Sequence, residues 1–229
     1  MAQNLQPYQV ELIDHAMTVD ALKFGSFTLK SGRISPYFFN AGLLSTGPLL
    51  NTLCTAYASV IASALSPSSP SPLPEFDVLF GPAYKGIPLA ACTSMLLHSQ
   101  HGISVGLAYD RKEPKDHGEG GSMVGVPVRG KRVLILDDVM TAGTAVRSAI
   151  DLIRREGGEV VGVVMCLDRE EVGKEGQSTV KEVDLAIGGK NQVRAILRMR
   201  DLMQWLKAKG RDEDLKGMQE YWEKYGVKE

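Results

Sequence analysis

Short apolar runs alternate with stretches of helical spacing through most of the chain, and this alternation limits the possible folds more than any other feature. The runs are continuous and rich in β-branched residues; they occupy 76–81, 103–109, 132–138, 160–168 and 194–197. Helices are expected between them, near 86–100 and 143–156. Continuous apolar strands are typical of a parallel sheet that is buried on both faces. We therefore predict an α/β fold with a central parallel sheet and helices on both faces, plus a small N-terminal segment.

The two ends of the chain complete the expected architecture. Apolar residues recur at helical spacing over 8–24, which predicts one or two short helices. The segment 27–39 has two short alternating stretches and predicts a hairpin. A helix is expected over about 48–65, because Pro48 suits a helix start. The last helix, near 212–225, carries an apolar stripe that we assign to packing: Leu215, Met218, Trp222 and Tyr225.

The length of 229 residues suits one domain with a small appendage. We interpret 1–229 as a single domain in which 1–45 form an N-terminal hood segment. The Ser/Pro-rich stretch 66–74 cannot form a helix or a central strand, so it is predicted to be a surface loop. It is not a domain boundary, because each flanking piece is too small to fold alone.

Composition excludes several functional classes. The formal net charge of −1 gives no overall attraction to nucleic acid or to an anionic membrane, so an anionic substrate must meet local cations. Cys54, Cys92 and Cys166 are far apart, show no zinc spacing and are interpreted as small buried hydrophobes. The N-terminus has no signal-peptide apolar region, and no run approaches the ~18 apolar residues of a membrane span. We expect a cytoplasmic protein.

The segment 133–145, VLILDDVMTAGTA, carries the strongest chemical signal. A buried strand ends in Asp137 and Asp138, and a turn of small residues, 141–145, then opens a helix. Small side chains allow several backbone N–H groups to approach one phosphate, and the helix N-terminus adds partial positive charge. One acid alone would be explained by helix capping. Two acids followed by this turn predict a sugar-phosphate site, with the carboxylates at the ribose hydroxyls.

This segment is neither a Walker A loop nor a dinucleotide fingerprint, because it lacks G-K-[ST] and G-x-G-x-x-G. It resembles the signature of the type I phosphoribosyltransferases, which bind 5-phosphoribosyl 1-pyrophosphate (PRPP). The turn GPAYKG (81–86) places Tyr84 and Lys85 after a strand, where a lysine can reach a diphosphate. On composition alone, an exposed loop lysine is the simpler explanation.

Two further segments are similar to those of orotate phosphoribosyltransferases. The loop 109–122 carries the string R-K-x-x-K-D-H-G-E-G-G and resembles that family's mobile catalytic loop, although its composition alone favours a solvated hairpin. The segment 27–42 resembles the family's N-terminal segment, where the equivalents of Lys30, Phe38 and Phe39 contact substrates. Without the family, the two phenylalanines are explained equally well as core residues.

Arg169, in LDRE (167–170), stands just past the end of a strand. The family uses the matching arginine on orotate, and a guanidinium suits a carboxylate because it binds it bidentately. Outside the family, a lone arginine at this place would be an ordinary salt-bridge partner. The chain continues into no decarboxylase-like barrel, so the fused two-activity form is not expected.

The resemblance implies transfer of the 5-phosphoribosyl group from PRPP to orotate, giving orotidine 5′-monophosphate and pyrophosphate. The implied catalytic residues are Lys115, Asp137 and Asp138. Orotate would contact Lys30, Phe38, Phe39, Thr141 and Arg169. PRPP would contact Lys30, Tyr84, Lys85, Arg111, Lys112, Lys115, His117, Asp137, Asp138, Val139, Met140, Thr141, Ala142, Gly143, Thr144 and Ala145. Mg²⁺ would be held mainly by the diphosphate and the ribose hydroxyls, with no firm protein ligand. A homodimer is implied, with the loop of one subunit closing the other's site.

Two other functions stay open on the residues. A PRPP-sensing regulator on the same fold would bind without catalysis, but it would not need the lysines of the 109–122 loop. A transferase that acts on a purine is disfavoured by Arg169 and by the 27–40 segment, in both cases through the resemblance alone.

Overall fold

The structure, a computed structural model, describes residues 5–29, 31–115, 121–140, 143–173 and 176–228, with the side chains of 114 and 115 outside that description. The described residues form a six-stranded sheet and a separate two-stranded hairpin. In the larger sheet the strand order is β5-β4-β3-β6-β7-β8. Its strands are β3 (Val78–Gly81), β4 (Gly106–Lys115), β5 (Gly121–Gly125), β6 (Arg132–Val139), β7 (Glu159–Asp168) and β8 (Val193–Arg198). The predicted α/β fold is confirmed.

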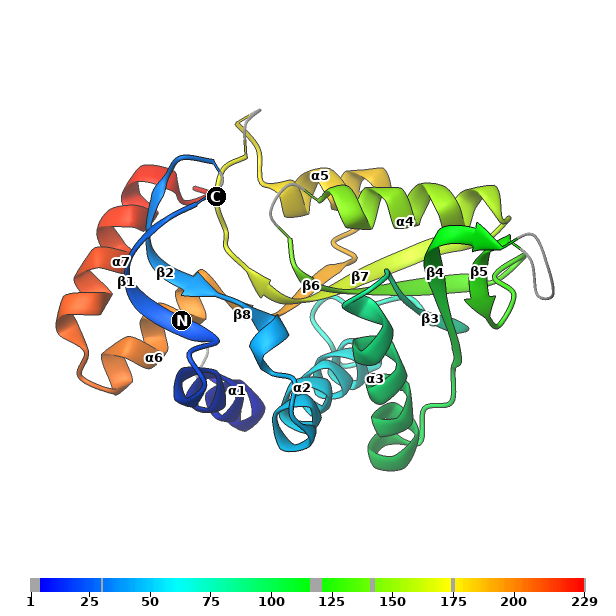
Figure 1. The fold of residues 1–229 in the computed structure, drawn as a ribbon, viewed down its shortest axis with the longest axis horizontal. Coiled ribbons are helices and arrows are strands. Elements are labelled where there is room, and N and C mark those ends of the chain that lie inside the picture. Colours follow the sequence, from blue (N-terminus) through cyan, green and yellow to red (C-terminus); the bar gives the residue numbers. More distant parts are fainter. Residues whose placement is uncertain (1–4, 30, 116–120, 141–142, 174–175, 229) are drawn as a thin grey trace.

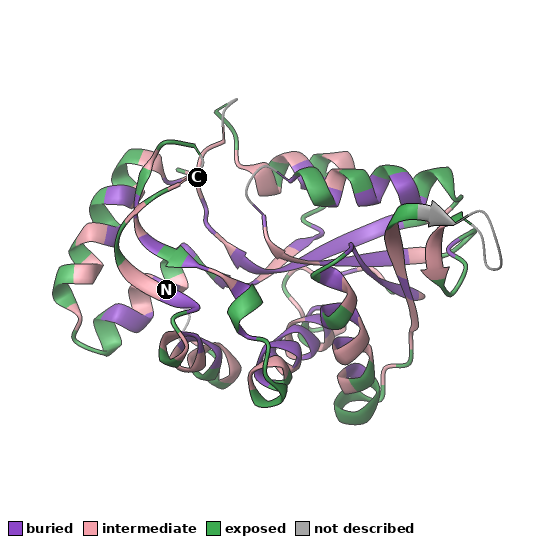
Figure 2. Cartoon of the chain, in the orientation of Figure 1, coloured by how far each residue is buried: buried purple, intermediate pink, exposed green. Residues whose placement is uncertain are grey.

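Helices cover both faces of this sheet, as the continuous apolar strands predicted (Figure 1). One face is covered by α2 (Gly47–Leu65) and α3 (Gly86–His101), and the other by α4 (Thr144–Arg155) and α5 (Thr179–Ala186). Their apolar sides turn toward the strands, and the sheet is the most deeply buried layer (Figure 2). Every residue of β3 is buried, and β7 is exposed only at its first residue. The core is therefore divided by the sheet into two parts.

The hood segment and the C-terminal helices lie together at one end of the sheet, where both chain ends are found (Figure 1). The hood contains the antiparallel strands of the predicted hairpin, and α7 packs against its second strand. The elements of this end are α1 (Pro7–Thr18), β1 (Leu22–Thr28), β2 (Ile34–Phe39), the 3-10 turn η1 (Ala41–Leu43), α6 (Met199–Ala208) and α7 (Asp212–Tyr225). The predicted packing role of the last helix is confirmed, since Met218 is fully buried and its stripe packs on the core.

Two expectations need correction, and one helix was not foreseen. The helical reading of 8–24 was wrong beyond Thr18, because Asp20 takes a left-handed conformation (φ 59°) and Leu22 already lies in β1. The 109–122 segment is no open loop in its described part: β4 runs on to Lys115 and pairs antiparallel with β5. The sheet is thus parallel except for this edge strand. The helix α5 was not foreseen at all, because its eight residues are too few to establish a period.

The helix α2 corrects the statement that no run approaches a membrane span. Its 19 residues are long and apolar enough to cross a bilayer by length and composition. However, Leu53, Cys54, Tyr57 and Ile61 are buried in the protein core, and α2 packs against α3 and α1. Burial against protein explains this apolar helix without a membrane. Of the cysteines, Cys54 and Cys166 are buried as expected, whereas Cys92 is half-buried.

The Ser/Pro-rich stretch 66–74 is exposed or half-buried except at Leu73, and it is anchored near its end. Leu73 is buried, and the guanidinium of Arg194 donates to the carbonyl and hydroxyl oxygens of Ser71 at 2.5 and 3.0 Å. No residue of the stretch lines the large cavity described below.

Deletion of Pro67–Pro72 should therefore leave kcat/KM nearly unchanged, because a loop costs little beyond its closure entropy. We expect a small loss of thermal stability, since Arg194 loses its two acceptors on Ser71. Steady-state kinetics and thermal unfolding check this. A loss of more than about tenfold in kcat/KM, roughly 1.4 kcal/mol, would place the stretch at the active site or at a subunit interface.

Candidate active site

The strand order reverses between β3 and β6, and a cavity opens there. The chain passes from β3 to β4 on one side and then returns to β6 on the other. Ligands of open α/β sheets bind beyond the carboxyl ends of strands at such a switch point. A cavity of about 530 Å³, here called the hood cavity, lies between this edge and the hood segment. It is lined by Thr28, Leu29, Ser31, Phe38, Phe39, Asn40, Ala41, Lys85, Asp138, Val139, Met140, Asp168, Arg169, Glu170, Glu171, Ser178, Thr179 and Val180.

The turn after β3 is built by two glycines in close contact. A Cβ on Gly81 would lie 2.1 Å from the carbonyl oxygen of Gly86, and one on Gly86 would lie 2.8 Å from the carbonyl carbon of Gly81. Only residues without side chains allow the strand to turn so tightly into α3. The backbone N–H of Ala83 donates to a carboxylate oxygen of Asp110 at 2.5 Å, which ties the turn to β4. This turn places Lys85 at the cavity.

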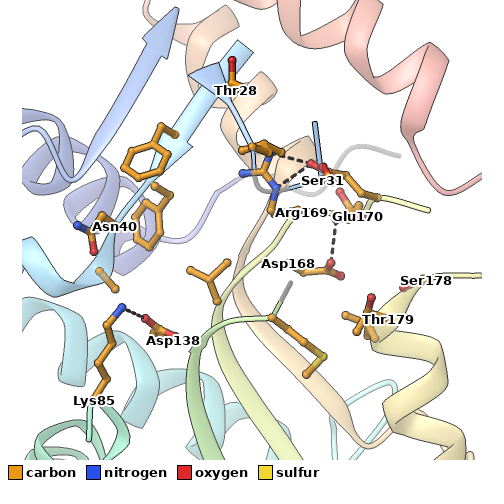
Figure 3. Close-up of a pocket in the computed structure, with 18 residues that line it drawn as sticks. Thr28, Ser31, Asn40, Lys85, Asp138, Asp168, Arg169, Glu170, Ser178 and Thr179 are labelled. Atoms are coloured by element: carbon orange, nitrogen blue, oxygen red, sulfur yellow. Dashed lines mark hydrogen bonds and ion pairs between the residues drawn. The ribbon is translucent and has the colours of Figure 1, made fainter. Parts of the chain in front are cut away.

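Lys85 and Asp138 meet across the switch point (Figure 3). The ammonium nitrogen of Lys85 lies 2.7 Å from Oδ2 of Asp138, although the two residues are 53 positions apart. The lysine side chain is 61% exposed, so water screens this ion pair and it contributes little to stability. Because a ligand can displace such a pair at small cost, both groups remain available to a substrate that carries hydroxyls and a diphosphate.

Asp137, half-buried like Asp138, is held by two hydrogen bonds. Its carboxylate accepts from the backbone N–H of Asp138 at 2.9 Å, and its carbonyl oxygen accepts from the hydroxyl of Tyr57 at 2.6 Å. Burial, and then the neighbouring Asp138 charge, raise the pKa of Asp137 to about 6. A cation or a hydroxyl donor bound near Asp137 would stabilise the charged form of its carboxyl group.

The pKa of Asp137 gives a stability prediction. An aspartate with a raised pKa binds its proton more tightly in the folded state, so stability falls as pH rises from about 4 through about 6. Asp137→Asn removes this loss and keeps the acceptor oxygen. The variant should be more stable than the parent by up to about 3 kcal/mol at pH 7.5 and no more stable at pH 4. Denaturant unfolding of the variant and the parent at both pH values tests this prediction. An equal difference in unfolding free energy at pH 4 and at pH 7.5 would contradict it.

The helix α4 begins at this edge of the sheet, as expected of a phosphate turn. Gly143 precedes it in a left-handed conformation (φ 70°), which glycine adopts without steric cost. No side chain caps this N-terminus within the described residues, so capping does not explain the small residues of the turn. Thr144 and Ala145 are exposed. The first N–H groups of α4 are therefore available to an anion.

Arg169 lies on the opposite side of the hood cavity, beyond the end of β7 (Figure 3). Its Nε donates to Oε1 of Glu171 at 2.7 Å, and its Nη2 donates to the hydroxyl of Ser35 at 2.9 Å. The guanidinium carbon stands 4.2 Å from the ring centre of Tyr37. Only 8% of the residue is exposed. It is thus a buried, firmly held cation at the cavity wall.

The structure places some of the predicted site residues at the hood cavity and others away from its lining. The predicted residues that line the hood cavity are Phe38, Phe39, Lys85, Asp138, Val139, Met140 and Arg169. The described ones that do not line it are Tyr84, Arg111, Lys112, Asp137, Gly143, Thr144 and Ala145. Lys30, His117, Thr141 and Ala142 lie outside the described residues, as does the side chain of Lys115. Phe39 is only 8% exposed and belongs to the core, whereas Phe38 is 40% exposed, so the core explanation holds for Phe39 and is wrong for Phe38.

Sequence reasoning missed several residues at the site. Asn40, Asp168, Ser178 and Thr179 line the cavity, and Asp110 holds the 81–86 turn. Asp168 ends an apolar run just as Asp138 does, so strand-end position could have identified it. Ser178 and Thr179 lie at the start of the short helix α5, across the cavity from Lys85 in Figure 3. No local sequence pattern indicates where this helix lies.

The donor groups fit a magnesium ion that is held mainly by its substrate. The described residues contain no cluster of three or more His, Cys, Asp or Glu side chains suited to a metal. Asp138 nevertheless offers a hard oxygen ligand at the cavity, and Asp137 stands behind it. Mg²⁺ keeps several waters and commonly binds through one or two carboxylates and substrate phosphates.

Comparison with known proteins gives consistent results. A family model described as "Phosphoribosyl transferase domain" matches residues 74–197. The orotate phosphoribosyltransferase of Thioalkalivibrio sulfidiphilus is 49% identical over 97% of this chain and 100% of its own, and that of Acinetobacter baumannii is 47% identical over 94% of each. The crystal structure of the orotate phosphoribosyltransferase of Francisella tularensis is similar with a TM-score of 0.81 and 38% identity, covering 95% of this chain and 100% of that one.

Proposed function

The chain belongs to the orotate phosphoribosyltransferase family, and from this premise we propose that the hood cavity is its active site. The activity of the family is transfer of the 5-phosphoribosyl group from PRPP to orotate, which yields orotidine 5′-monophosphate and pyrophosphate in pyrimidine synthesis. The observation that carries the proposal is the meeting of Lys85 and Asp138 at the switch point, opposite the buried Arg169.

PRPP is proposed to bind along the carboxyl edge of β3 and β6. The N–H groups at the start of α4 would hold the 5′-phosphate, and Asp138 would accept from a ribose hydroxyl with Asp137 behind it. Lys85 would then leave its ion pair with Asp138 and bind the diphosphate instead. Because positive charge develops on the ribose as the diphosphate leaves, carboxylates beneath the sugar stabilise the transition state. When bound, Mg²⁺ would neutralise charge on the leaving diphosphate.

Orotate is proposed to bind between Arg169 and the hood strand β2. A planar pyrimidine carboxylate suits a guanidinium on one side and the rings of Phe38 and Phe39 on the other. Lys30 and Thr141 are proposed contacts through the resemblance. Closure of the cavity would exclude water, which would otherwise capture the ribosyl cation.

The 109–122 segment is proposed to close over the site of a neighbouring subunit in a homodimer. Its basic residues would then face the diphosphate: Arg111, Lys112, Lys115 and His117. Tyr84, Val139, Met140 and Ala142 complete the proposed PRPP contacts. The support for this is the resemblance of the loop string, together with a β4–β5 hairpin that projects from the far edge of the sheet (Figure 1). A cytoplasmic location is proposed as well, in keeping with an α/β fold whose apolar helices are covered by protein.

A substrate panel tests the assignment directly. Initial rates with PRPP, Mg²⁺ and orotate, uracil, hypoxanthine or adenine should show turnover with orotate at least a hundredfold above the others. Turnover of a purine would place the chain with purine transferases. PRPP binding by calorimetry without turnover of any base would instead indicate a PRPP sensor.

Arg169→Ala should raise the orotate KM by roughly 30- to 100-fold, because a charge-assisted contact of about 2–3 kcal/mol is lost. The KM for PRPP should change far less, and the preference for orotate over uracil should narrow. Initial rates over both substrates check this. If the orotate KM does not move, or if the PRPP KM moves equally, Arg169 does not bind the carboxylate.

A further inference from the structure

The guanidinium of Arg169 is oriented by one glutamate. Both Nε and Nη2 lie 2.7 Å from Oε1 of Glu171, while Nη2 also donates to Ser35 at 2.9 Å. These hydrogen bonds and this ion pair of Arg169 involve Nε and Nη2. Since the ring of Tyr37 stacks on the guanidinium at 4.2 Å, the arginine is fixed on one edge and one face. Its Nη1 end remains for a ligand in the cavity.

Glu171 is itself held from the side away from Arg169. Nη1 of Arg33, in the hood hairpin, lies 3.5 Å from Oε2 of Glu171, and Nη2 of Arg33 donates to the carbonyl of Val172 at 2.9 Å. The side chain of Glu171 is only 15% exposed. One carboxylate oxygen thus faces Arg169 and the other faces Arg33, so that the glutamate cannot rotate without losing an ion pair.

The chain end fixes the backbone of the same segment. The N–H of Val172 donates to the carbonyl of Tyr225 at 2.9 Å, and the N–H of Val227 donates to the carbonyl of Glu170 at 2.8 Å. Glu171 and Gly226 form an antiparallel bridge between these bonds. The ring of Tyr225 also stacks under Arg33 at 4.8 Å. The C-terminal helix therefore joins the hood hairpin to the segment that carries Arg169.

We infer that Glu171 is a positioning residue for orotate, which holds Arg169 so that its Nη1 end meets the substrate carboxylate. This inference rests on the proposed role of Arg169. Two effects oppose one another when Glu171 is removed. The local potential becomes more positive, which favours an anion, but the guanidinium loses its fixed orientation. Arg169 is buried, so it can meet the substrate in few orientations. The loss of its fixed orientation therefore outweighs the gain in positive potential, and orotate binding weakens.

The test compares Glu171→Ala and Glu171→Gln with the parent enzyme by steady-state kinetics in both substrates. Glu171→Ala should raise the orotate KM by about tenfold, and Glu171→Gln by less, because its amide oxygen still accepts from Arg169. The PRPP KM should stay within about twofold of the parent value. The preference for orotate over uracil should decrease as the orotate KM rises. Asp14→Asn is the matched control: this acid joins α1 to Trp205 and Lys209 outside the cavity, and both KM values should stay unchanged.

A double-mutant cycle separates positioning from general structural support. In an Arg169→Ala background, Glu171→Ala should raise the orotate KM no further, because a positioning residue acts only through its partner. An orotate KM that is unchanged or lowered in Glu171→Ala, or that rises equally with the PRPP KM, overturns the inference. If Arg169→Ala is itself without effect, the role of Arg169 in the proposed function fails as well. An effect of Arg169→Ala without one of Glu171→Ala defeats the positioning role alone.

Discussion

Asp137→Asn combined with Asp138→Asn should abolish turnover and weaken PRPP binding while the fold stays intact. The two acids stand at the end of β6, between Lys85 and the start of α4, where a ribose would lie beneath its 5′-phosphate. Both substitutions preserve side-chain volume, and the amide oxygen introduced by Asp137→Asn can still accept from the backbone N–H of position 138. Loss of function would therefore reflect lost charge and lost hydroxyl acceptors rather than altered packing.

Calorimetric titration with PRPP and Mg²⁺ decides this prediction, with circular dichroism as the check on folding. The single variants should differ, since only Asp138 lines the cavity. We expect Asp138→Asn to weaken PRPP binding more, and Asp137→Asn to act mainly on kcat. Asp212→Asn combined with Glu213→Gln removes two charges from the exposed start of α7 and should leave activity unchanged. Unchanged PRPP affinity in the Asp137/Asp138 double variant would mean that these acids do not contact the ribose of PRPP.

Lys115→Ala should lower kcat by about 10²- to 10³-fold, as expected when one preorganised charge stabiliser is removed. PRPP affinity should change much less, because the cation matters most as charge develops on the leaving diphosphate. Lys115 is the last residue of β4 and pairs there with Gly121 of β5. Lys190→Ala, a change at an exposed lysine on a distant turn, is the control and should have no effect.

Subunit mixing tests whether Lys115 acts across a dimer interface. Two inactive proteins, Lys115→Ala and the Asp137/Asp138 double variant, are mixed in equal amounts and allowed to exchange subunits. If the lysine acts in trans, each hybrid dimer has one site with both intact acids and an intact Lys115. Random exchange makes about half of the dimers hybrid, so roughly a quarter of the parent activity should return. No recovery despite proven exchange would assign Lys115 to its own subunit's site.

Local patterns in the sequence were sufficient to predict every strand of the larger sheet except β5, and to single out the segment 133–145. Strands such as 132–138 and 160–168 were recognisable because a strand buried on both faces must be apolar at every position. The two acids at the strand end and the start of α4 were recognisable for a related reason: the end of a strand and the start of a helix are short-range features. These features involve residues that are close together along the chain, so the spacing of residue types is enough to predict them.

Only the tertiary structure showed the contacts between segments that are distant along the chain. The ion pair of Lys85 with Asp138 depends on strand order, since it exists only because β3 and β6 are neighbours in the sheet. The network of Arg169, Glu171 and Ser35 depends on the hood hairpin being placed over the end of β7, across 134 positions from Ser35 to Arg169. A sequence pattern records which residues are adjacent along the chain, whereas these contacts are selected by the packing of whole elements. For the same reason α5 was found only in the folded chain, and only the structure showed that β4 extends to Lys115 and pairs with β5.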